Sequence, residues 1–331
     1  MIRPRIFLTH AESVRRNYYD DRAVARLREL GEVVLNDTGG PLTTAQLVDA
    51  ARDCQVIVSD RQAAGPAELF RRLPRLAVFM RCAVDIRNVE VAAASAEGVL
   101  VTRASAGFAT AVAEWVMGAA IDLLRHTSDH VGAYRGGSVP VPTIGRELRG
   151  AALGVLGYGA IGRELCRLGL AFGMTVHVAD PLVRVDDTAI CQAELDEVIG
   201  AADVVVCLVP ANAQTENLMN AQRFARMKPG AVFINAARGE LVDEAALLAA
   251  LDNGRLAGCA MDVGRAPDQM PSPVLAAHPR VIATPHVGGL TPAAVAHQAH
   301  ETVEQLAALL RGETPVGAVN GDRARRLPTL R

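Results

Sequence analysis

Residues 151–162 read AALGVLGYGAIG and carry the strongest fold signal in the chain. An apolar run, typical of a buried strand, ends in the pattern Gly157-x-Gly159-x-x-Gly162, and a helical pattern follows. Gly157 would permit a tight turn, Gly159 would let the backbone approach a pyrophosphate, and Gly162 would let the helix pack on the strand. The unpaired N–H groups at the helix start would then face the phosphates. The stretch therefore predicts a dinucleotide-binding βα unit.

An acidic residue follows at the distance that such a site requires. Asp180 lies eighteen residues past Gly162 and closes a second apolar run, residues 175–179. A carboxylate at this point can accept hydrogen bonds from ribose hydroxyls and would repel a 2′-phosphate. NAD is therefore favoured over NADP as the cofactor, although Arg184 lies four residues on and could soften that preference.

The composition is that of an ordinary globular protein with room for about two domains. The chain has 331 residues, half of them hydrophobic, with 34 basic and 36 acidic side chains. This balance gives no reason to expect a nucleic-acid or membrane partner. Its six cysteines are scattered without a CxxC pair, which predicts buried free thiols in a reducing compartment. We expect a cytoplasmic protein with no signal peptide, no spanning helix and no metal site.

Strand and helix patterns alternate along the chain, which predicts parallel sheets with helices on their faces. In the first hundred residues the strand patterns are 5–8, 32–35, 56–59 and 76–80, and the helical patterns are 22–30, 44–51 and 66–73. A long helix is predicted from about residue 105 to 130, followed by a Gly/Pro-rich break. After the glycine loop, further strands are predicted at 204–209, 231–235, 258–263 and 281–284. A last helix, 291–311, precedes an Arg-rich tail from Gly321 that is expected to fray.

Two side chains that can carry chemistry follow predicted strands. Arg238 comes after the strand 231–235, and His286 comes after the strand 281–284. In open α/β sheets, ligands bind beyond the carboxyl ends of the strands. A guanidinium can hold a carboxylate through two parallel hydrogen bonds, and an imidazole can donate or accept the proton of an alcohol near neutral pH. Together with a nicotinamide, these two groups would suffice to oxidise a 2-hydroxy acid. Each could equally be a surface, ion-pair or turn residue.

Four segments resemble one known family. Residues 154–163, 235–243, 260–263 and 284–289 are similar, in this order, to motifs of the D-isomer-specific 2-hydroxyacid dehydrogenases. The resemblance implies two Rossmann-like, doubly wound parallel-sheet domains. The substrate domain would be discontinuous, residues 1–103 and 288–331, around an NAD-binding domain, residues 104–287. It also implies a homodimer formed through the NAD-binding domains.

The resemblance assigns roles to residues of this chain. Arg238 would bind the substrate's carboxylate and carbonyl, His286 would be the acid/base, and Asp262 would bond the nicotinamide amide. Residues 81–85 match a loop whose backbone N–H groups hold the substrate carboxylate, with candidate contacts at Arg81, Cys82, Ala83 and Val84. We expect cofactor contacts at Gly157, Tyr158, Gly159, Ala160, Ile161, Gly162, Asp180, Val209, Pro210, Thr215, Ala236, Ala237, Arg238, Asp262, His286 and Gly288. Asp262 and Asp85 could instead be turn or cap acids.

The chain departs from the family near the expected acid/base. Most members have a glutamate, followed by proline, that orients the histidine and raises its pKa. Here the matching residues 262–271 read DVGRAPDQMP, with no glutamate and with Gly264 in place of the usual phenylalanine. Asp268 could replace the glutamate, Gln269 could orient the ring without charge, or the pair could be absent. We favour Asp268 as the third catalytic residue.

A second departure is Arg81, which stands where the family has glycine. If its side chain turned inward, it would favour a substrate with a second negative group. If it turned outward, it would be a solvated surface charge, which is the commoner outcome for arginine.

The sequence predicts an NAD(P)-dependent 2-hydroxyacid dehydrogenase, or 2-ketoacid reductase, that acts on CH–OH donors. One alternative is a formate- or phosphite-type dehydrogenase of the same fold, in which Arg265 or Arg81 would serve a dianion. Another is an NADH-sensing, corepressor-like binding protein, since fold alone does not fix function. Phosphoglycerate oxidation is a further option, and the identity of the hydroxy acid stays open.

Overall fold

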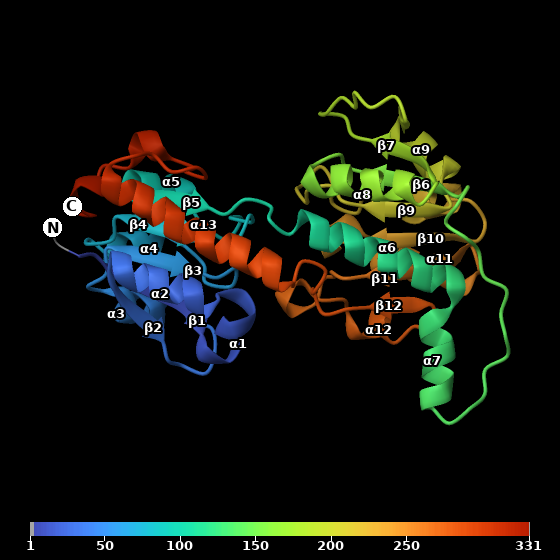
Figure 1. The fold of residues 1–331 in the computed structure, drawn as a ribbon, viewed down its shortest axis with the longest axis horizontal. Helices are drawn as coiled ribbons and strands as arrows, with labels where there is room; N and C mark the ends of the chain where they lie inside the picture. Colours follow the sequence, from blue (N-terminus) through green and yellow to red (C-terminus); the bar gives the residue numbers. More distant parts are fainter. Residues whose placement is uncertain (1–2, 331) are drawn as a thin grey trace. The chain divides into compact units, whose positions relative to one another are not determined.

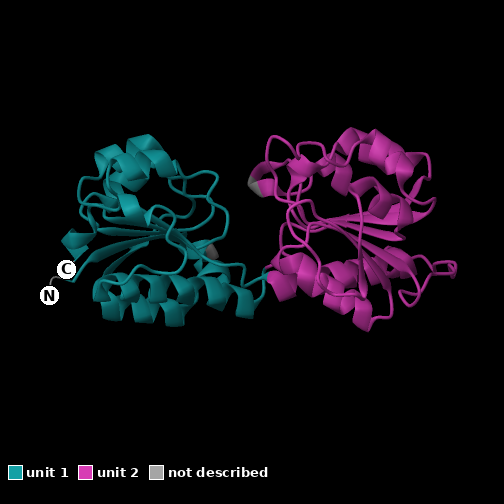
Figure 2. Cartoon of the chain, turned by 90° about the horizontal axis from the view of Figure 1, so that it is seen from above, with its two compact units in different colours: residues 1–108, 290–331 teal, residues 109–289 magenta. Residues whose placement is uncertain are grey.

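The computed structural model describes residues 3–330, apart from the side chains of Val14 and Asp268. The chain folds into two compact units, coloured separately in Figure 2: unit 1 is residues 1–108 and 290–331, and unit 2 is residues 109–289. The predicted boundaries, after residues 103 and 287, lie five and two residues before these. Unit 1 is thus made from both ends of the chain.

Unit 1 is built on a five-stranded parallel sheet in the order β2-β1-β3-β4-β5 (Figure 1). Its helices cover both faces: α2 and α13 pack on one face, and α3, α4 and α5 on the other. The side chains of Asp20, Thr43 and Thr291 cap α2, α3 and α13 by accepting a backbone N–H. The elements are β1 (Arg5–Ala11), α1 (Glu12–Tyr18), α2 (Asp21–Leu30), β2 (Glu32–Asn36), α3 (Thr44–Ala51), β3 (Val56–Ser59), α4 (Ala67–Arg72), β4 (Val78–Arg81), α5 (Val91–Ala96), β5 (Leu100–Arg103) and α13 (Pro292–Arg311).

Unit 2 is built on a seven-stranded parallel sheet in the order β12-β11-β10-β9-β6-β7-β8. Helices α9, α10 and α11 pack on one face of this sheet, and α6 and α8 pack together against it. The elements are α6 (Ala109–Arg125), α7 (Thr127–Arg135), β6 (Ala152–Leu156), α8 (Ala160–Ala171), β7 (Thr175–Ala179), β8 (Ile190–Gln192), α9 (Leu195–Ala201), β9 (Val204–Cys207), α10 (Ala221–Arg226), β10 (Ala231–Asn235), α11 (Glu244–Asp252), β11 (Leu256–Met261), α12 (Pro273–Ala276) and β12 (Val281–Ala283).

The strand order of unit 2 reverses between β6 and β9, which are neighbours in the sheet but not in the chain. Ligands of doubly wound sheets bind at such a switch point. Both sheets are wholly parallel, and their central strands are buried, so the predicted fold class is confirmed. Among residues 3–330, no helix has the length and apolar character needed to cross a membrane.

The predicted helix 105–130 is wrong in two respects. It begins only at Ala109, and it is broken at His126, which has a φ of 55°. At the break, the carboxylate of Asp122 accepts the backbone N–H of Ser128 at 2.7 Å and so caps the second helix, α7. A left-handed residue followed by a side-chain cap redirects the chain without the proline or glycine that would have been visible in the sequence.

The tail is packed rather than frayed. The Arg326 guanidinium donates to the carbonyl of Leu73 and to the carboxylate of Glu97, both at 2.9 Å, and Leu330 is only 2% exposed. The cysteine prediction holds for five of the six thiols, which are free and buried, whereas Cys191 is free and exposed.

His10 makes the stability of unit 1 depend on pH. The ring lies 5.1 Å from that of Tyr19 and is 1% exposed, and its burial lowers the imidazole pKa from 6.5 to about 4. Between these two values the unfolded chain binds a proton that the folded chain does not, so the free energy of unfolding falls as the pH falls. We expect a loss of roughly 3 kcal/mol over this window. In urea denaturation at several pH values, His10→Gln should remove most of this dependence, and equal slopes for both proteins would contradict the assignment.

Candidate active site

The glycine loop lies at the switch point of unit 2. Gly157 has a φ of 101°, and a Cβ there would lie 3.0 Å from the carbonyl of Leu208, which follows β9. A Cβ on Gly162 would lie 2.2 Å from the carbonyl oxygen of Gly157, so only glycine lets α8 start this close to β6. A Cβ on Gly159 would meet nothing within 4 Å. Two glycines are thus required by the backbone, and the middle one faces open space.

The start of α8 presents free backbone donors. Gly159 is the N-cap residue and offers no side-chain cap, and Gly159 and Ala160 are exposed. The first N–H groups of a helix have no intrahelical partner, and the helix dipole favours an anion beside them. Tyr158 is buried under the guanidinium of Arg163, which lies 4.4 Å from the ring centre. These residues fit the pyrophosphate of a dinucleotide.

Substitution of Gly162 tests this geometry. In Gly162→Ala, the new methyl group would meet backbone rather than a movable side chain, so α8 must shift away from β6. We expect the Kd for NADH to rise at least about tenfold and Tm to fall by several degrees. The matched control is Gly118→Ala in α6, where a Cβ meets nothing within 4 Å. Unchanged NADH affinity in Gly162→Ala would contradict the assignment of this loop.

Asp180 lies beside the glycine loop. Its carboxylate accepts the backbone N–H of Tyr158 at 2.7 Å on one oxygen, and those of Leu182 and Val183 at 2.9 and 3.0 Å on the other. These bonds fix the acid at the carboxyl end of β7, next to the turn that would hold the phosphates. The neighbouring Arg184 is highly exposed and lies 3.9 Å from Asp186.

Three neighbouring segments carry Arg238, Asp262 and His286. They follow β10, β11 and β12, which are adjacent in the sheet. The backbone N–H of Asp262 donates to Asn235 at 3.2 Å, and that of Thr284 donates to the carbonyl of Met261 at 3.0 Å. The segments therefore lie side by side at the same edge of the sheet as the glycine loop.

Asp262 fixes the loop of His286. Its buried carboxylate accepts the Thr284 hydroxyl at 2.6 Å and the N–H groups of Val287 and Gly288 at 2.8 Å each. His286 itself has a φ of 57°, the left-handed region that favours glycine or asparagine. A strained backbone held by a buried acid is typical of a functional position. The carboxylate retains acceptor capacity for one further donor, so its predicted bond to the nicotinamide stays a prediction.

Arg238 is half-buried, and its loop is braced by Asn235. The Asn235 side chain donates to the carbonyl of Arg238 at 2.8 Å and accepts the N–H of Ala237 at 3.1 Å. One guanidinium nitrogen of Arg238 donates to the carbonyl of Ala237 at 2.6 Å. Asn235 and Thr284 support the candidate site, and neither was predicted, because a polar residue at a strand end carries no signal of its own.

The segment expected to hold the partner of His286 is a folded-back loop. The N–H of Gly264 donates to Gln269 at 2.8 Å, and that of Ala266 donates to Met270 at 3.0 Å. A Cβ on Gly264 would lie 2.4 Å from the Cα of Pro271, which explains why no larger residue stands there. Gln269 has a φ of 59°. The side chain of Asp268 lies outside the described residues, so its pairing with His286 stays a prediction.

Other predicted residues have structural partners. The exposed Arg265 pairs with Glu216 at 2.8 Å and donates to Asn217 at 2.7 Å, so its charge already has a partner within the protein. The Thr215 hydroxyl donates to the carbonyl of Pro210 at 2.8 Å and so closes the loop after β9. Asp85 accepts the N–H of Arg87 at 3.0 Å, as a turn acid does.

In unit 1, the loop after β4 offers backbone donors. The N–H of Cys82 is taken by the carbonyl of Ser59 at 2.9 Å, and its thiol is buried. Among the described residues, the N–H groups of Ala83 and Val84 donate no hydrogen bond, and both residues are half-buried. Successive free N–H groups form a concavity that suits an anion. Of the predicted backbone donors to the substrate carboxylate, Cys82 is therefore already bonded within the protein, and Ala83 and Val84 remain as candidates.

Arg81 is not the surface charge that its residue type favours. It is fully buried, and its guanidinium donates to the carbonyls of Asp60 and Ala63 and to the side chain of Asn88. Burial lowers the pKa of this guanidinium to about 10, so it stays charged at neutral pH. The expectation of an outward side chain is wrong, because three acceptors of two neighbouring loops satisfy the charge inside the protein.

Comparison with known proteins identifies the family. Residues 117–288 match the model of the D-isomer specific 2-hydroxyacid dehydrogenase, NAD binding domain. The chain is 34% identical over 257 residues to D-3-phosphoglycerate dehydrogenase of Bacillus subtilis, which covers 76% of this chain and 49% of that protein. It is 32% identical over 291 residues to (S)-sulfolactate dehydrogenase of Chromohalobacter salexigens, which covers 86% of this chain and 92% of that protein. The chain therefore belongs to the D-isomer specific 2-hydroxyacid dehydrogenase family.

The solved structures agree on the fold. The NADPH-dependent glyoxylate/hydroxypyruvate reductase of Sinorhizobium meliloti, solved with NADP and malonate, aligns with a TM-score of 0.80 at 27% identity over 96% of this chain and 97% of that chain. The predicted family and the predicted cofactor NAD are confirmed by the relatives and by the match of residues 117–288 to the NAD binding domain of the family. The chain spans only about half the length of the D-3-phosphoglycerate dehydrogenases that it matches, 49% of the Bacillus subtilis protein and 57% of that of Methanocaldococcus jannaschii.

Proposed function

We propose that this chain is an NAD-dependent oxidoreductase that interconverts a 2-hydroxy acid, of D configuration, and its 2-oxo acid. The observation that carries the proposal is the edge of the sheet in unit 2. There, the glycine loop at the switch point shares one edge with three hydrogen-bonded segments that bear Arg238, Asp262 and His286. A dinucleotide site beside a cation and an imidazole is what hydride transfer to an oxo acid requires.

Each group has a separate task in the reduction. NADH, when bound, supplies the hydride. Arg238 binds the carboxylate of the oxo acid and polarises its carbonyl. In unit 1, the free N–H groups of Ala83 and Val84 are candidate donors to a carboxylate of the substrate. His286 donates a proton to the alkoxide oxygen as it forms, and removes it in the reverse reaction. Asp262 keeps the imidazole loop in place through Thr284, Val287 and Gly288.

NAD is the preferred cofactor in this proposal, because the Asp180 carboxylate, which accepts the N–H of Tyr158 beside the glycine loop, would repel a 2′-phosphate. The test is turnover by the purified chain. NADH and NADPH would each be offered with glyoxylate, pyruvate, hydroxypyruvate and larger aliphatic and aromatic 2-oxo acids, and NAD with 3-phosphoglycerate, sulfolactate, formate and phosphite. Oxidation of NADH by at least one 2-oxo acid supports the proposal. Turnover of formate or phosphite alone, or NADH binding without any turnover, would contradict it.

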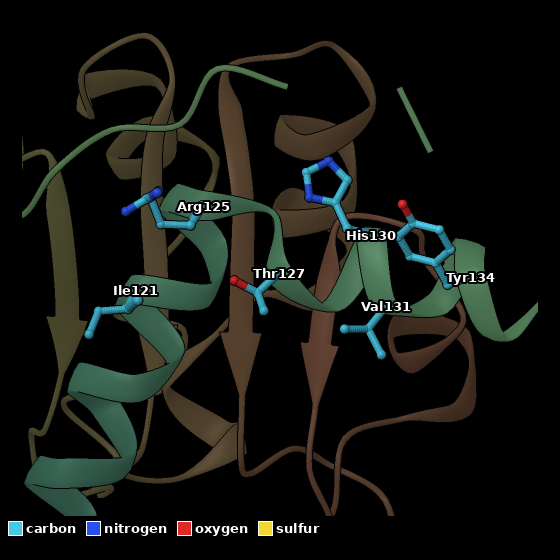
Figure 3. A pocket seen from close by; sticks show the side chains of 6 residues that line it. All are labelled: Ile121, Arg125, Thr127, His130, Val131 and Tyr134. Carbon is cyan, nitrogen blue, oxygen red and sulfur yellow. The ribbon is translucent and has the colours of Figure 1, made fainter. Parts of the chain in front are cut away.

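We also propose that the chain forms a homodimer through unit 2. An open pocket of about 410 Å³ lies where α6 meets α7. Figure 3 shows the side chains that line it, Ile121, Arg125, Thr127, His130, Val131 and Tyr134. Apolar side chains on α7 and after it are exposed: Val131 by 40%, Tyr134 by 64% and Ile144 by 97%. An apolar surface of this kind suits contact with a second copy.

Sedimentation velocity tests the dimer. We expect twice the mass of the 34.9 kDa chain for the wild type, and a monomer for a double variant Val131→Asp, Ile144→Asp, since two charges would be buried without partners. The matched control is Val316→Asp in unit 1, which replaces an 82% exposed valine. A monomeric wild type would contradict the proposal.

A cytoplasmic location completes the proposal. It is supported by the six cysteines, which are all free, since such thiols persist in a reducing compartment.

A further inference from the structure

Two loops at the carboxyl edge of the sheet in unit 1 are joined by one arginine. The Arg81 guanidinium donates to the backbone carbonyls of Asp60 and Ala63, at 3.0 Å for Ala63, both in the loop after β3. It also donates to the side chain of Asn88, at 2.5 Å, in the loop after β4. The guanidinium carbon of Arg81 lies 5.8 Å from the ring centre of Phe79, which is on the same strand, β4.

Asn88 continues this connection. Its side-chain amide donates to the carbonyl of Arg61 at 3.0 Å, and its own carbonyl accepts the N–H of Gly65 at 2.9 Å. Gly65 in turn accepts the N–H of Glu90 at 2.8 Å. Five hydrogen bonds therefore join the segments 60–65 and 81–90, and two of them come from the side chain of Arg81. A third bond of the same side chain, to Asn88, fixes the donor of another of the five.

The charge of Arg81 is not directed at a ligand. The residue is 0% exposed, and it forms no ion pair among residues 3–330. The neighbouring acid Asp60 has other partners, since its carboxylate accepts the Thr9 hydroxyl and the N–H groups of Gln62 and Ala63 at 2.7 to 2.9 Å. The Nε atom of Arg81 is buried without a partner. A substrate anion could reach this guanidinium only by displacing the loop carbonyls.

The loop that Arg81 secures is the one that matters for the substrate. Ala83 and Val84 follow Arg81 directly, and their N–H groups are the free donors to which the proposed function assigns the carboxylate. Two donors bind an anion well only if their directions are fixed beforehand, and a misplacement of about 1 Å can cost two orders of magnitude in rate. The bonds of Arg81 and Asn88 fix the backbone on both sides of these donors.

We propose that Arg81 and Asn88 form a clamp that positions the carboxylate-binding loop, and that Arg81 is therefore a positioning residue and not a receptor for a second negative group of the substrate. The inference rests on the proposed function for the role of Ala83 and Val84. It predicts that the substrate needs no second anionic group, and that any preference for a dianion comes from other residues.

Three variants test the clamp: Arg81→Met, Arg81→Lys and Asn88→Ala. Lysine keeps the charge but cannot donate to three acceptors in the guanidinium's fixed geometry. For a clamp, Arg81→Lys and Arg81→Met should both raise KM about tenfold, equally for pyruvate and for the dianionic 2-oxoglutarate, with the Kd for NADH unchanged. Arg81→Lys with wild-type KM for 2-oxoglutarate, or a KM increase confined to that dianion, would overturn the proposal.

The exchange of backbone amides provides a readout that needs no activity. In hydrogen–deuterium exchange of the protein without substrate, Arg81→Lys and Asn88→Ala should both speed exchange in segments 60–66 and 82–90. In the double variant, the effect on exchange should be smaller than the sum of the effects of the two single substitutions, because both side chains serve the same connection between the loops. Asn88 is exposed, so its variant remains informative if Arg81→Met does not fold. Unchanged exchange in Asn88→Ala would overturn the clamp.

The control is Arg75→Met, which removes an exposed arginine of unit 1 that pairs with Asp53 at 3.4 Å. It should change neither KM nor exchange in the two segments. If the wild type reduces no 2-oxo acid, the proposed function fails, while the exchange experiment still decides whether the clamp exists.

Discussion

Replacing Arg238 by methionine should lower kcat/KM for every 2-oxo acid substrate about a thousandfold, because the carboxylate would lose a two-point, charge-assisted partner. The half-buried guanidinium is held at the carboxyl end of β10 by its bond to Ala237, and its backbone by Asn235. We expect the Kd for NADH to change little. Steady-state kinetics and a fluorescence titration with NADH measure the two quantities.

Arg238→Lys separates charge from geometry. A lysine keeps the positive charge but cannot bind a carboxylate through two parallel bonds, so it should recover only part of the loss. Arg223→Met is the control, since this arginine of α10 in unit 2 forms an ion pair with Asp196 of α9 at 3.1 Å. If Arg238→Met kept wild-type kcat/KM, Arg238 would not be the carboxylate receptor.

Replacing His286 by asparagine should lower kcat about a thousandfold, because no group would then donate a proton to the alkoxide. Asparagine is a more informative substitution than alanine at this position. His286 has a φ of 57°, a conformation that asparagine adopts more readily than other residues, so the variant tests chemistry with little added strain. Rapid-quench kinetics should show the loss in the chemical step, with the Kd for NADH preserved.

His278→Asn provides the same chemical change elsewhere in unit 2. His278 lies in the turn before β12, with its Nε2 atom 3.2 Å from a carboxylate oxygen of Asp252. Its replacement should affect stability more than turnover. A His286→Asn enzyme with wild-type kcat would rule out His286 as the acid/base.

The sequence was sufficient to predict the fold because both sheets are parallel and their central strands are buried. Their strands read as short apolar runs, and the glycine loop marks the first strand of unit 2. That unit 1 contains both ends of the chain was predicted from the resemblance to the family. The helix 105–130 was mispredicted because one residue, His126, takes a left-handed conformation that its type does not signal.

The candidate site was predictable only where one residue carries the chemistry. Arg238 and His286 stand at strand ends, and a parallel sheet necessarily brings such ends to one edge. Arg81 was not predictable, because its orientation depends on Ala63, eighteen residues earlier, and on Asn88, seven residues later. The folded-back loop at Gly264 was likewise not predictable, because it depends on close contact with the backbone of Pro271, which no local sequence pattern indicates.

Hydride transfer from NADH to the substrate can be followed with an isotope. NADH carrying deuterium at the transferable position of its nicotinamide would be incubated with the chain and a 2-oxo acid that it turns over, and the product examined by mass spectrometry and chiral chromatography. We predict a D-2-hydroxy acid with a single deuterium on its second carbon. A product without the label, or NADH that binds but never delivers deuterium to any 2-oxo acid, would contradict the account.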